Sequence, residues 1–262
     1  MTIGGWCEHD RLLQWPVRDS RRTIRNGELM TEAILPQFSD STLVKHHKSY
    51  TFKPHYRGFM IKHVTQKQRV VQLASKLGII SRADVREADL PEEYLSRLEQ
   101  DDKLTALAPG VYMAQDHDAS EFLELAVVAK KVPNAVLFGI SALQFHDLTT
   151  QVAHAVQIAI ERGSWTPQLE WPTLETFHIS GEAFSAGVEH HIIEKSVELK
   201  VYSVAKTVAD LFKFRNNLGL DVAIEALREG WREQRFTMDE LYAHAKSCRV
   251  KTVMRPYLEM LQ

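Results

Sequence analysis

The segment 65–113 constrains the fold of this chain more than any other. Apolar residues recur at helical spacing until Gly78, which is a typical helix-ending glycine. Ser81 is a good N-cap for a second short helix, and Pro91 suits the first turn of a third. Two strand patterns then flank a turn at Pro109-Gly110. Three short helices followed by a hairpin predict a winged helix-turn-helix.

The second half, residues 119–262, mixes helix and strand patterns. Ser120 is the expected N-cap of an apolar helix at 122–131. The strands that follow are expected at 135–138, 155–160 and 174–179, with a hairpin at 188–193 and 197–202. The expected helices are a short one at 141–146 and longer ones at 203–216, at 221–234 and from the capping box at Thr237 onward. We therefore expect an α/β (α+β) chain, with an N-terminal winged helix-turn-helix followed by a mixed α/β domain ending in a helical bundle.

Residues 1–59 show no sustained period of either 2 or 3.6. Their composition predicts a poorly ordered arm. The alternative is a mis-annotated start, because Met60 stands directly before the first periodic segment. The expected domains are thus the arm at 1–59, the winged helix-turn-helix at 60–118 and the α/β domain at 119–262.

The charge balance argues against a protein whose whole surface binds nucleic acid. The 262 residues carry a net charge of −2. Nine Lys/Arg against six Asp/Glu give +3 over 1–59, eight against ten give −2 over 60–118, and fifteen against eighteen give −3 over 119–262. Any surface that contacts phosphates must therefore be a local patch.

The chain has two cysteines, Cys7 and Cys248, whose separation fits no metal-ligand pattern. No stretch approaches the roughly 20 apolar residues of a membrane span, and the N-terminus lacks the apolar core of a signal peptide. We expect a cytoplasmic protein that does not enter a membrane.

Four strings of residues resemble the AbiEi family, the antitoxin and autorepressor half of a bacterial abortive-infection (type IV) toxin–antitoxin pair. They are LAPGVY at 107–112, SALQFHDLTT at 141–150, VYSVAKTVADLFKFR at 201–215 and GLDVAIEAL at 219–227. The resemblance covers roughly residues 66–261. It implies that the N-terminal module binds and represses the operator DNA of its own operon. It also implies that the C-terminal domain supports cooperative repression and counters a nucleotidyltransferase-like toxin, with or without a stable complex.

If the third helix enters a major groove, Leu95 and Leu98 must turn inward and the opposite face must read the bases. Arg97 then suits guanine and Gln100 suits adenine, each contributing about 1–3 kcal/mol of discrimination. The acidic pair Glu92-Glu93 at the start of this helix opposes phosphate contact, so neighbouring elements must contribute. The expected DNA-contacting residues are Arg82, Arg86, Ser96, Arg97, Gln100, Lys103 and Thr105. The alternative is that Arg97 is an ordinary solvated residue.

Basic residues also gather near the C-terminus, where 200–255 holds eleven Lys/Arg against seven Asp/Glu. They can form a phosphate-binding stripe that serves antitoxicity, or they can be ordinary surface charge offset by Asp210 and Glu225. We call this expected patch the C-terminal stripe, and it consists of Lys206, Lys213, Arg215, Arg249, Lys251 and Arg255.

Two alternatives to a DNA-binding regulator remain open. The acidic balance of 60–118 is consistent with a module that binds a protein and no DNA. The string Glu198-Leu199-Lys200 resembles half of a metal-dependent nuclease site, with Glu170 or Glu175 as a generic second acid. His190 and His191 are strand neighbours that point to opposite faces, which disfavours shared metal ligation. We expect no catalytic site, no metal and no cofactor, with a homodimer on DNA as one possible assembly.

Overall fold

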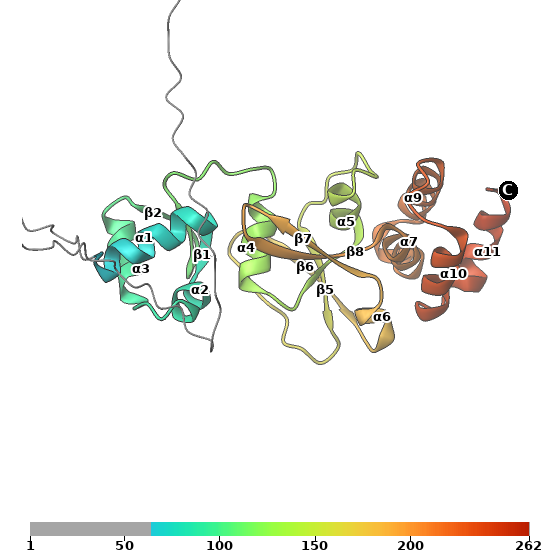
Figure 1. The fold of residues 1–262 in the computed structure, drawn as a ribbon. Helices are drawn as coiled ribbons and strands as arrows, with labels where there is room; N and C mark the ends of the chain where they lie inside the picture. Colours follow the sequence, from blue (N-terminus) through green and yellow to red (C-terminus); the bar gives the residue numbers. More distant parts are fainter. Residues whose placement is uncertain (1–63, 262) are drawn as a thin grey trace, which may run out of the picture. The chain divides into compact units, whose positions relative to one another are not determined.

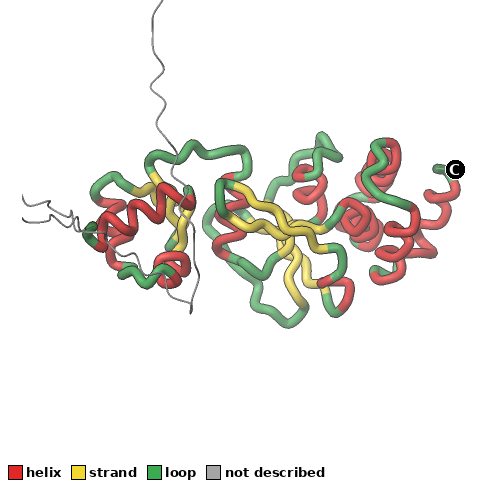
Figure 2. Tube along the Cα trace, viewed as in Figure 1, coloured by secondary structure: helices red, strands yellow, loops and turns green. Residues whose placement is uncertain are grey.

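The structure is a computed structural model that describes residues 64–261. These residues belong to one compact unit, residues 60–262. The unit contains both helices and strands, which confirms the predicted α/β class (Figure 2). The expected arm at 1–59 lies outside the described residues. The expected boundary between residues 118 and 119 stays a prediction.

Residues 64–118 form what we call the helix-hairpin module (Figure 1). Its helices are α1 (Gln66–Leu77), α2 (Arg82–Glu87) and α3 (Glu93–Gln100), and its strands are β1 (Ile79–Ser81), β2 (Leu104–Ala108) and β3 (Val111–Ala114). The strands pair antiparallel in the order β1-β3-β2. Three helices followed by a hairpin is the order that the sequence predicts for a winged helix-turn-helix.

Local capping explains why these helices begin where they do. Thr65 and Gln68 form a capping box at α1, and Ser81 and Asp84 form another at α2. α3 has no side-chain cap, and it begins two residues after Pro91. The three helices bury one apolar cluster against the sheet, made of Val70, Ala74, Ile80, Val85, Leu90, Leu95, Leu98, Leu104, Tyr112 and Ala114.

Residues 119–202 form the sheet domain. It contains α4 (Leu123–Lys131), β4 (Val136–Leu137), α5 (Gly139–Phe145), β5 (Val156–Glu161), β6 (Leu174–Ile179), α6 (Glu182–Ser185), β7 (Val188–Ile193) and β8 (Val197–Tyr202). The strand order is β6-β5-β4-β8-β7, in which β5–β6 and β4–β8 are parallel. The predicted hairpin of β7 and β8 is confirmed, with Ile193 opposite Val197.

One capping prediction in this domain is wrong. The N-cap of α4 is Phe122, which makes no side-chain cap, and it is not Ser120. The Ser120 hydroxyl accepts a hydrogen bond from the Phe122 N–H over 3.1 Å while it donates to Glu194, far along the chain. A tertiary contact has therefore displaced the local cap.

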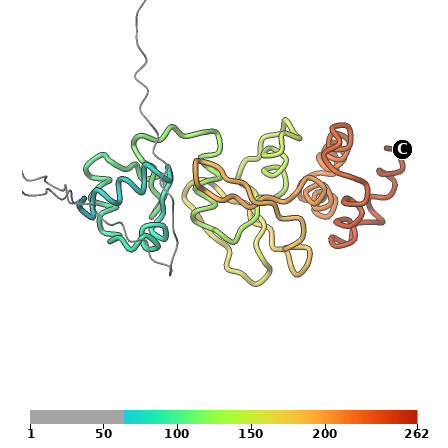
Figure 3. The backbone as a smooth tube through the Cα atoms, viewed as in Figure 1, coloured from blue at the N-terminus to red at the C-terminus, as the bar shows by residue number. Residues whose placement is uncertain are grey.

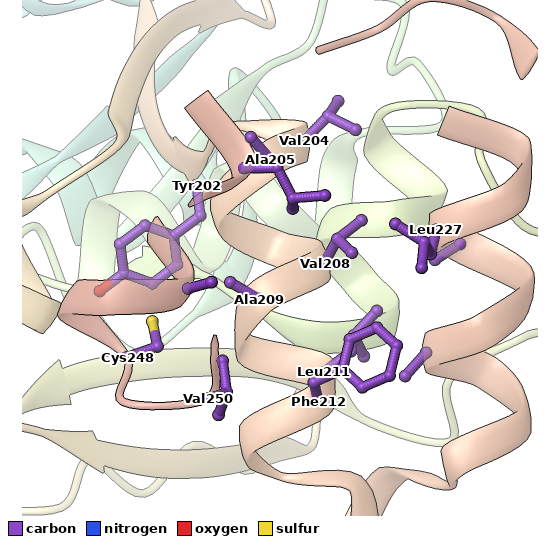
Figure 4. Close-up of a cluster of buried hydrophobic side chains, with 14 of the residues drawn as sticks. Tyr202, Val204, Ala205, Val208, Ala209, Leu211, Phe212, Leu227, Cys248 and Val250 are labelled. Atoms are coloured by element: carbon purple, nitrogen blue, oxygen red, sulfur yellow. The ribbon is translucent and has the colours of Figure 1, made fainter. Parts of the chain in front are cut away.

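The last part of the chain is helical, as predicted (Figure 3). It consists of α7 (Val204–Lys213), α8 (Arg215–Leu218), α9 (Leu220–Arg232), α10 (Met238–Ser247) and α11 (Lys251–Glu259). α7 lies against α9 and α10, and its Val208, Leu211 and Phe212 are fully buried among them (Figure 4). The predicted capping box between Thr237 and Glu240 opens α10.

Helix α4 joins the two sheets of the described unit, because it contacts β8 on one side and β1 and β3 on the other (Figure 1). Ile79 and Val111 of the helix-hairpin module share one buried cluster with Val127 of α4 and with Leu199 and Val201 of β8. The helix-hairpin module and the sheet domain therefore have a common core.

None of the helices that the structure describes is both long enough and apolar enough to span a bilayer.

Candidate nucleic-acid interface

The outward face of α3 carries Ser96, Arg97 and Gln100, all exposed. Leu95 and Leu98 are buried on the opposite face, as the sequence predicts. The Arg97 guanidinium lies 3.7 Å from a Glu93 carboxylate oxygen and 5.5 Å from the centre of the Tyr94 ring. Because exposed ion pairs of this kind contribute only about 0–1 kcal/mol, Arg97 is free to exchange Glu93 for another acceptor.

Helix α2 presents Arg82 and Arg86 on its exposed surface. Arg86 holds the Glu92 carboxylate through two nitrogens, at 3.0 Å from Nε and 2.9 Å from Nη2. Glu92, one of the two acidic residues at the start of α3, is thereby partly neutralised by α2.

The expected hairpin contacts, Lys103 and Thr105, lie at one end of the hairpin, and Arg82 of α2 lies at the other. Lys103 lies beside the end of α3, where its N–H donates to the Leu98 carbonyl over 2.9 Å. Thr105 is exposed on β2, which contacts α3. Arg82 instead lies at the turn, where its side chain contacts Gly110 and its N–H donates to the Gly110 carbonyl over 3.1 Å. The structure therefore groups Lys103 and Thr105 with α3, and Arg82 with the turn.

Acidic residues surround α3 on its exposed side. Glu93, Glu99, Asp101 and Asp102 are exposed in this part of the chain, and Asp101 is ion-paired with Lys67 of α1. The field at this face is therefore mixed in sign. Phosphate attraction by α3 alone is correspondingly weak.

The expected C-terminal stripe loses one member, because Lys206 is buried. Its side chain is 0% exposed and is ion-paired with Asp210, which is also 0% exposed. The ammonium lies 4.0 Å from the centre of the Tyr202 ring. The reason is the packing of α9 and α10 onto α7, which turns this face of α7 into the core.

The same buried cluster includes a thiol. The Cys248 sulfur lies 3.1 Å from the second Asp210 oxygen and donates to it. Burial and the neighbouring Asp210 raise the pKa of Cys248 to about 12, so the thiol stays protonated. Burial also raises the pKa of Asp210, against the opposing effect of Lys206.

The other five members of the stripe remain accessible. Lys213 and Arg215 are half-buried, and Arg215 donates to the Phe212 carbonyl over 2.9 Å. Arg249, Lys251 and Arg255 are exposed, with Lys251 5.6 Å from the centre of the Tyr242 ring and Arg255 paired with Glu259 over 2.8 Å. Cations beside an exposed aromatic ring are compatible with nucleic acid.

Comparison with known families gives a match on the helix-hairpin module. Residues 68–115 match the model of the family described as "Transcriptional regulator, AbiEi antitoxin". The helix-hairpin module is therefore similar to the corresponding segment of AbiEi antitoxins. The resemblance inferred from the sequence is confirmed there, and the AbiEi role is that of an antitoxin and transcriptional regulator. No curated protein matches the chain.

The strings outside the AbiEi match have structural roles. The Ser141 hydroxyl accepts the Gln157 N–H over 3.0 Å, and Gln157 in turn accepts the Ile140 N–H at the start of α5. His146 bonds the Tyr202 carbonyl over 2.8 Å, and burial lowers the pKa of His146. Lys206 and Asp210 belong to the core described above. Packing therefore accounts for these residues without a ligand.

The residues considered for a nuclease do not converge. Glu198 is exposed and lies 2.7 Å from His190, while Lys200 donates to the Pro133 carbonyl over 2.9 Å. Glu175 accepts from Gln157 over 2.8 Å. Among residues 64–261, no three or more His, Cys, Asp or Glu side chains are grouped so that they could hold a metal ion.

Sequence reasoning missed two lysines at the end of α4. Lys130 lies 2.7 Å from Asp84 of α2, and Lys131 donates to the Pro109 carbonyl of the hairpin turn over 2.8 Å. Basic residues in a last helical turn are ordinarily explained by the helix dipole. Nothing in the neighbouring sequence distinguishes lysines that only interact with the helix dipole from lysines that also contact the helix-hairpin module.

Proposed function

We propose that this protein binds the operator DNA of its own operon through α3 and the adjoining hairpin, and so represses it. The observation that carries the proposal is that the AbiEi match, residues 68–115, covers the segment that presents Ser96, Arg97 and Gln100 to solvent. In this proposal α3 enters a major groove. Arg97 leaves Glu93 for a guanine edge, and Gln100 contacts adenine.

Phosphate contacts complete the proposed interface. Lys103 and Thr105 lie beside α3, and Arg82 and Arg86 project from α2. We propose that these residues contact the DNA phosphates on either side of the groove. Since the face of α3 is mixed in charge, we propose that it acts with a second cationic surface. That surface comes from the same chain, through the accessible part of the C-terminal stripe, or from a second copy in a homodimer.

A gel shift of the full chain with a fragment of its own promoter, run over a salt series, tests DNA binding. We expect retardation at low salt that falls steeply as salt rises. Arg97→Ala should weaken binding and relax the preference for one base pair, whereas Arg228→Ala, an exposed arginine on α9, should change neither. If the unmodified chain retards no DNA even at low salt, DNA binding is wrong. The acidic face of α3 would then favour a protein partner.

We propose further that the protein counters a nucleotidyltransferase-like toxin in the cytoplasm, without catalysis and without a cofactor. The AbiEi match supports an antitoxin in general, and the toxin class rests on the family resemblance. Co-expression with the product of the adjacent gene tests this role. Restored growth supports it, and unrestored growth in cells that contain the folded protein contradicts it.

A further inference from the structure

The turn between β7 and β8, residues 194–196, contacts the helix-hairpin module. One Glu194 carboxylate oxygen lies 2.6 Å from His117 Nε2, and the other accepts from the N–H of Ser120 over 2.9 Å and from its hydroxyl. The side chains of His117 and Glu194 are 3% and 1% exposed. Ser196 donates to the Leu77 carbonyl at the end of α1 over 2.8 Å. We call Glu194, His117 and Ser120 the Glu194 cluster.

The cluster also fixes the end of α1. A Cβ atom added to Gly78 would lie 2.8 Å from two atoms of the His117 ring, so only glycine lets the ring pack there. Gly78 itself has a φ of 79°, which glycine adopts readily. Glu194 therefore holds a ring that is seated against the end of α1.

The turn places two charged residues at backbone positions that usually take glycine or asparagine. Glu194 and Lys195 have φ values of 44° and 66°, a region that disfavours residues other than glycine and asparagine. His117 Nε2 must donate to the carboxylate, and its Nδ1 is buried with no hydrogen-bond partner among the described residues. Two residues of positive φ close a hairpin in the ordinary way, so what needs an explanation here is the buried glutamate in the turn and the unpaired Nδ1 atom of His117.

Two more attachments reach the module from α4. Lys130 holds Asp84 of α2, and Lys131 holds the Pro109 carbonyl of the hairpin turn. With the Glu194 cluster, they fix α1, α2 and the hairpin, which are the elements around α3. None of these polar contacts involves α3, so its outward face stays free.

We propose that Glu194 is a positioning residue for DNA binding, because it fastens the helix-hairpin module to the sheet domain in the orientation that DNA requires. This inference rests on the proposed function. A fixed module does not lose orientational freedom when it binds DNA, whereas a loosened module does, and this loss weakens binding. If binding uses a second surface of the same chain, loosening also lowers the effective concentration of one surface near the other.

The charge of Glu194 is part of this role. Burial by itself would raise the pKa of Glu194, but hydrogen bonds from Ser120 and His117 outweigh burial and lower it. The carboxylate is therefore ionised. Glu194→Gln removes that charge at nearly constant volume, and Glu194→Ala removes every contact of the carboxylate.

Hydrogen exchange of the full chain, read by mass spectrometry, tests the proposal without DNA. We expect Glu194→Ala to speed exchange about tenfold or more in peptides covering 74–80 and 115–122, with a smaller effect for Glu194→Gln. Peptides from α7 should stay unchanged. Lys195→Ala is the matched control, because Lys195 is exposed on the same turn and has no place in the cluster. In gel shifts, Glu194→Ala should raise the Kd for the promoter fragment about tenfold, with no change for Lys195→Ala.

Unchanged exchange at 115–122 in both Glu194 variants overturns the proposal, whatever the DNA result. If Glu194→Ala speeds exchange in α7 as well, the variant has unfolded globally, and Glu194→Gln decides by whether it loosens 115–122 selectively. Faster exchange with an unchanged Kd removes the positioning role. If the unmodified chain binds no DNA, the proposed function fails, and the exchange data then show only whether the fastening exists.

Discussion

At the scale of single residues, the buried pair of Lys206 and Asp210 shows how a charge can belong to the core. Removing one partner of such a pair leaves the other charged and buried without compensation. We predict that Lys206→Ala lowers the free energy of unfolding by about 3–5 kcal/mol in urea titrations. Lys213→Ala, at a half-buried lysine on the same helix, should cost far less.

The opposite outcome would be informative. If Lys206→Ala kept full stability and weakened DNA binding, Lys206 would have to be an accessible phosphate contact, as the sequence suggests, and the buried placement would be wrong.

Glu194 should make the stability of the folded protein fall as the pH is lowered. Its folded-state pKa lies below its usual value of 4.5, so its ionised form stabilises the folded protein above that value. This stabilisation is lost as the pH falls through 4.5 and on through the lowered pKa. We predict that Glu194→Gln lacks this part of the loss of stability at acid pH in urea unfolding. Glu189→Gln, at an exposed glutamate of β7, should keep it. Parallel pH curves for the parent and Glu194→Gln would refute the assignment.

The residues that the sequence places correctly are those governed by neighbours in the chain. Ser81 and Thr237 cap their helices as predicted, and Leu95 and Leu98 turn inward as the helical period requires. Lys206 is different, because a lysine four residues before an aspartate occurs equally well on a solvated helix. Only the packing of α9 and α10, which is remote in sequence, buries it.

At the scale of elements, the capping box of α2 has a double use. Asp84 accepts from Ser81 within the cap and from Lys130 of α4. We predict that Ser81→Ala lowers the free energy of unfolding by about 1 kcal/mol, the usual value of an N-cap. Ser96→Ala, at an exposed serine of α3, should change it by less than about 0.5 kcal/mol. If Ser81→Ala and Ser96→Ala lowered the free energy of unfolding equally in urea titrations, the cap would make no specific contribution to stability.

Elements with a clear period or a recognisable cap are predictable, and their pairing partners are not. The hairpin of β7 and β8 is placed to the residue by its alternation of apolar and polar side chains. β4 lies within the strand predicted at 135–138, although only Val136–Leu137 are paired. β1, with three residues, is too short for a period and is not predicted from the sequence; it pairs with β3. The parallel pairing of β4 with β8 joins segments about 60 residues apart, which no local pattern encodes.

At the scale of the whole molecule, the common core around α4 predicts shared stability. Val127 of α4 packs in the cluster that contains residues of both sheets. We predict that Val127→Ala lowers the free energy of opening, measured by hydrogen exchange in urea, by about 1 kcal/mol or more in α1 and in α7 together. Val152→Ala, at a valine that is 77% exposed, should shift neither. A shift confined to α1 would show that the helix-hairpin module unfolds on its own.

The mixed charge around α3 has a consequence for how a regulator searches a genome. Nonspecific attraction to DNA comes almost entirely from cations that neutralise phosphates. If α3 reads DNA as proposed, the neighbouring Glu93, Glu99, Asp101 and Asp102 would weaken its attraction to unrelated sequence. Fewer copies would then be sequestered by the many competing sites, and fewer would be needed to keep one operator occupied.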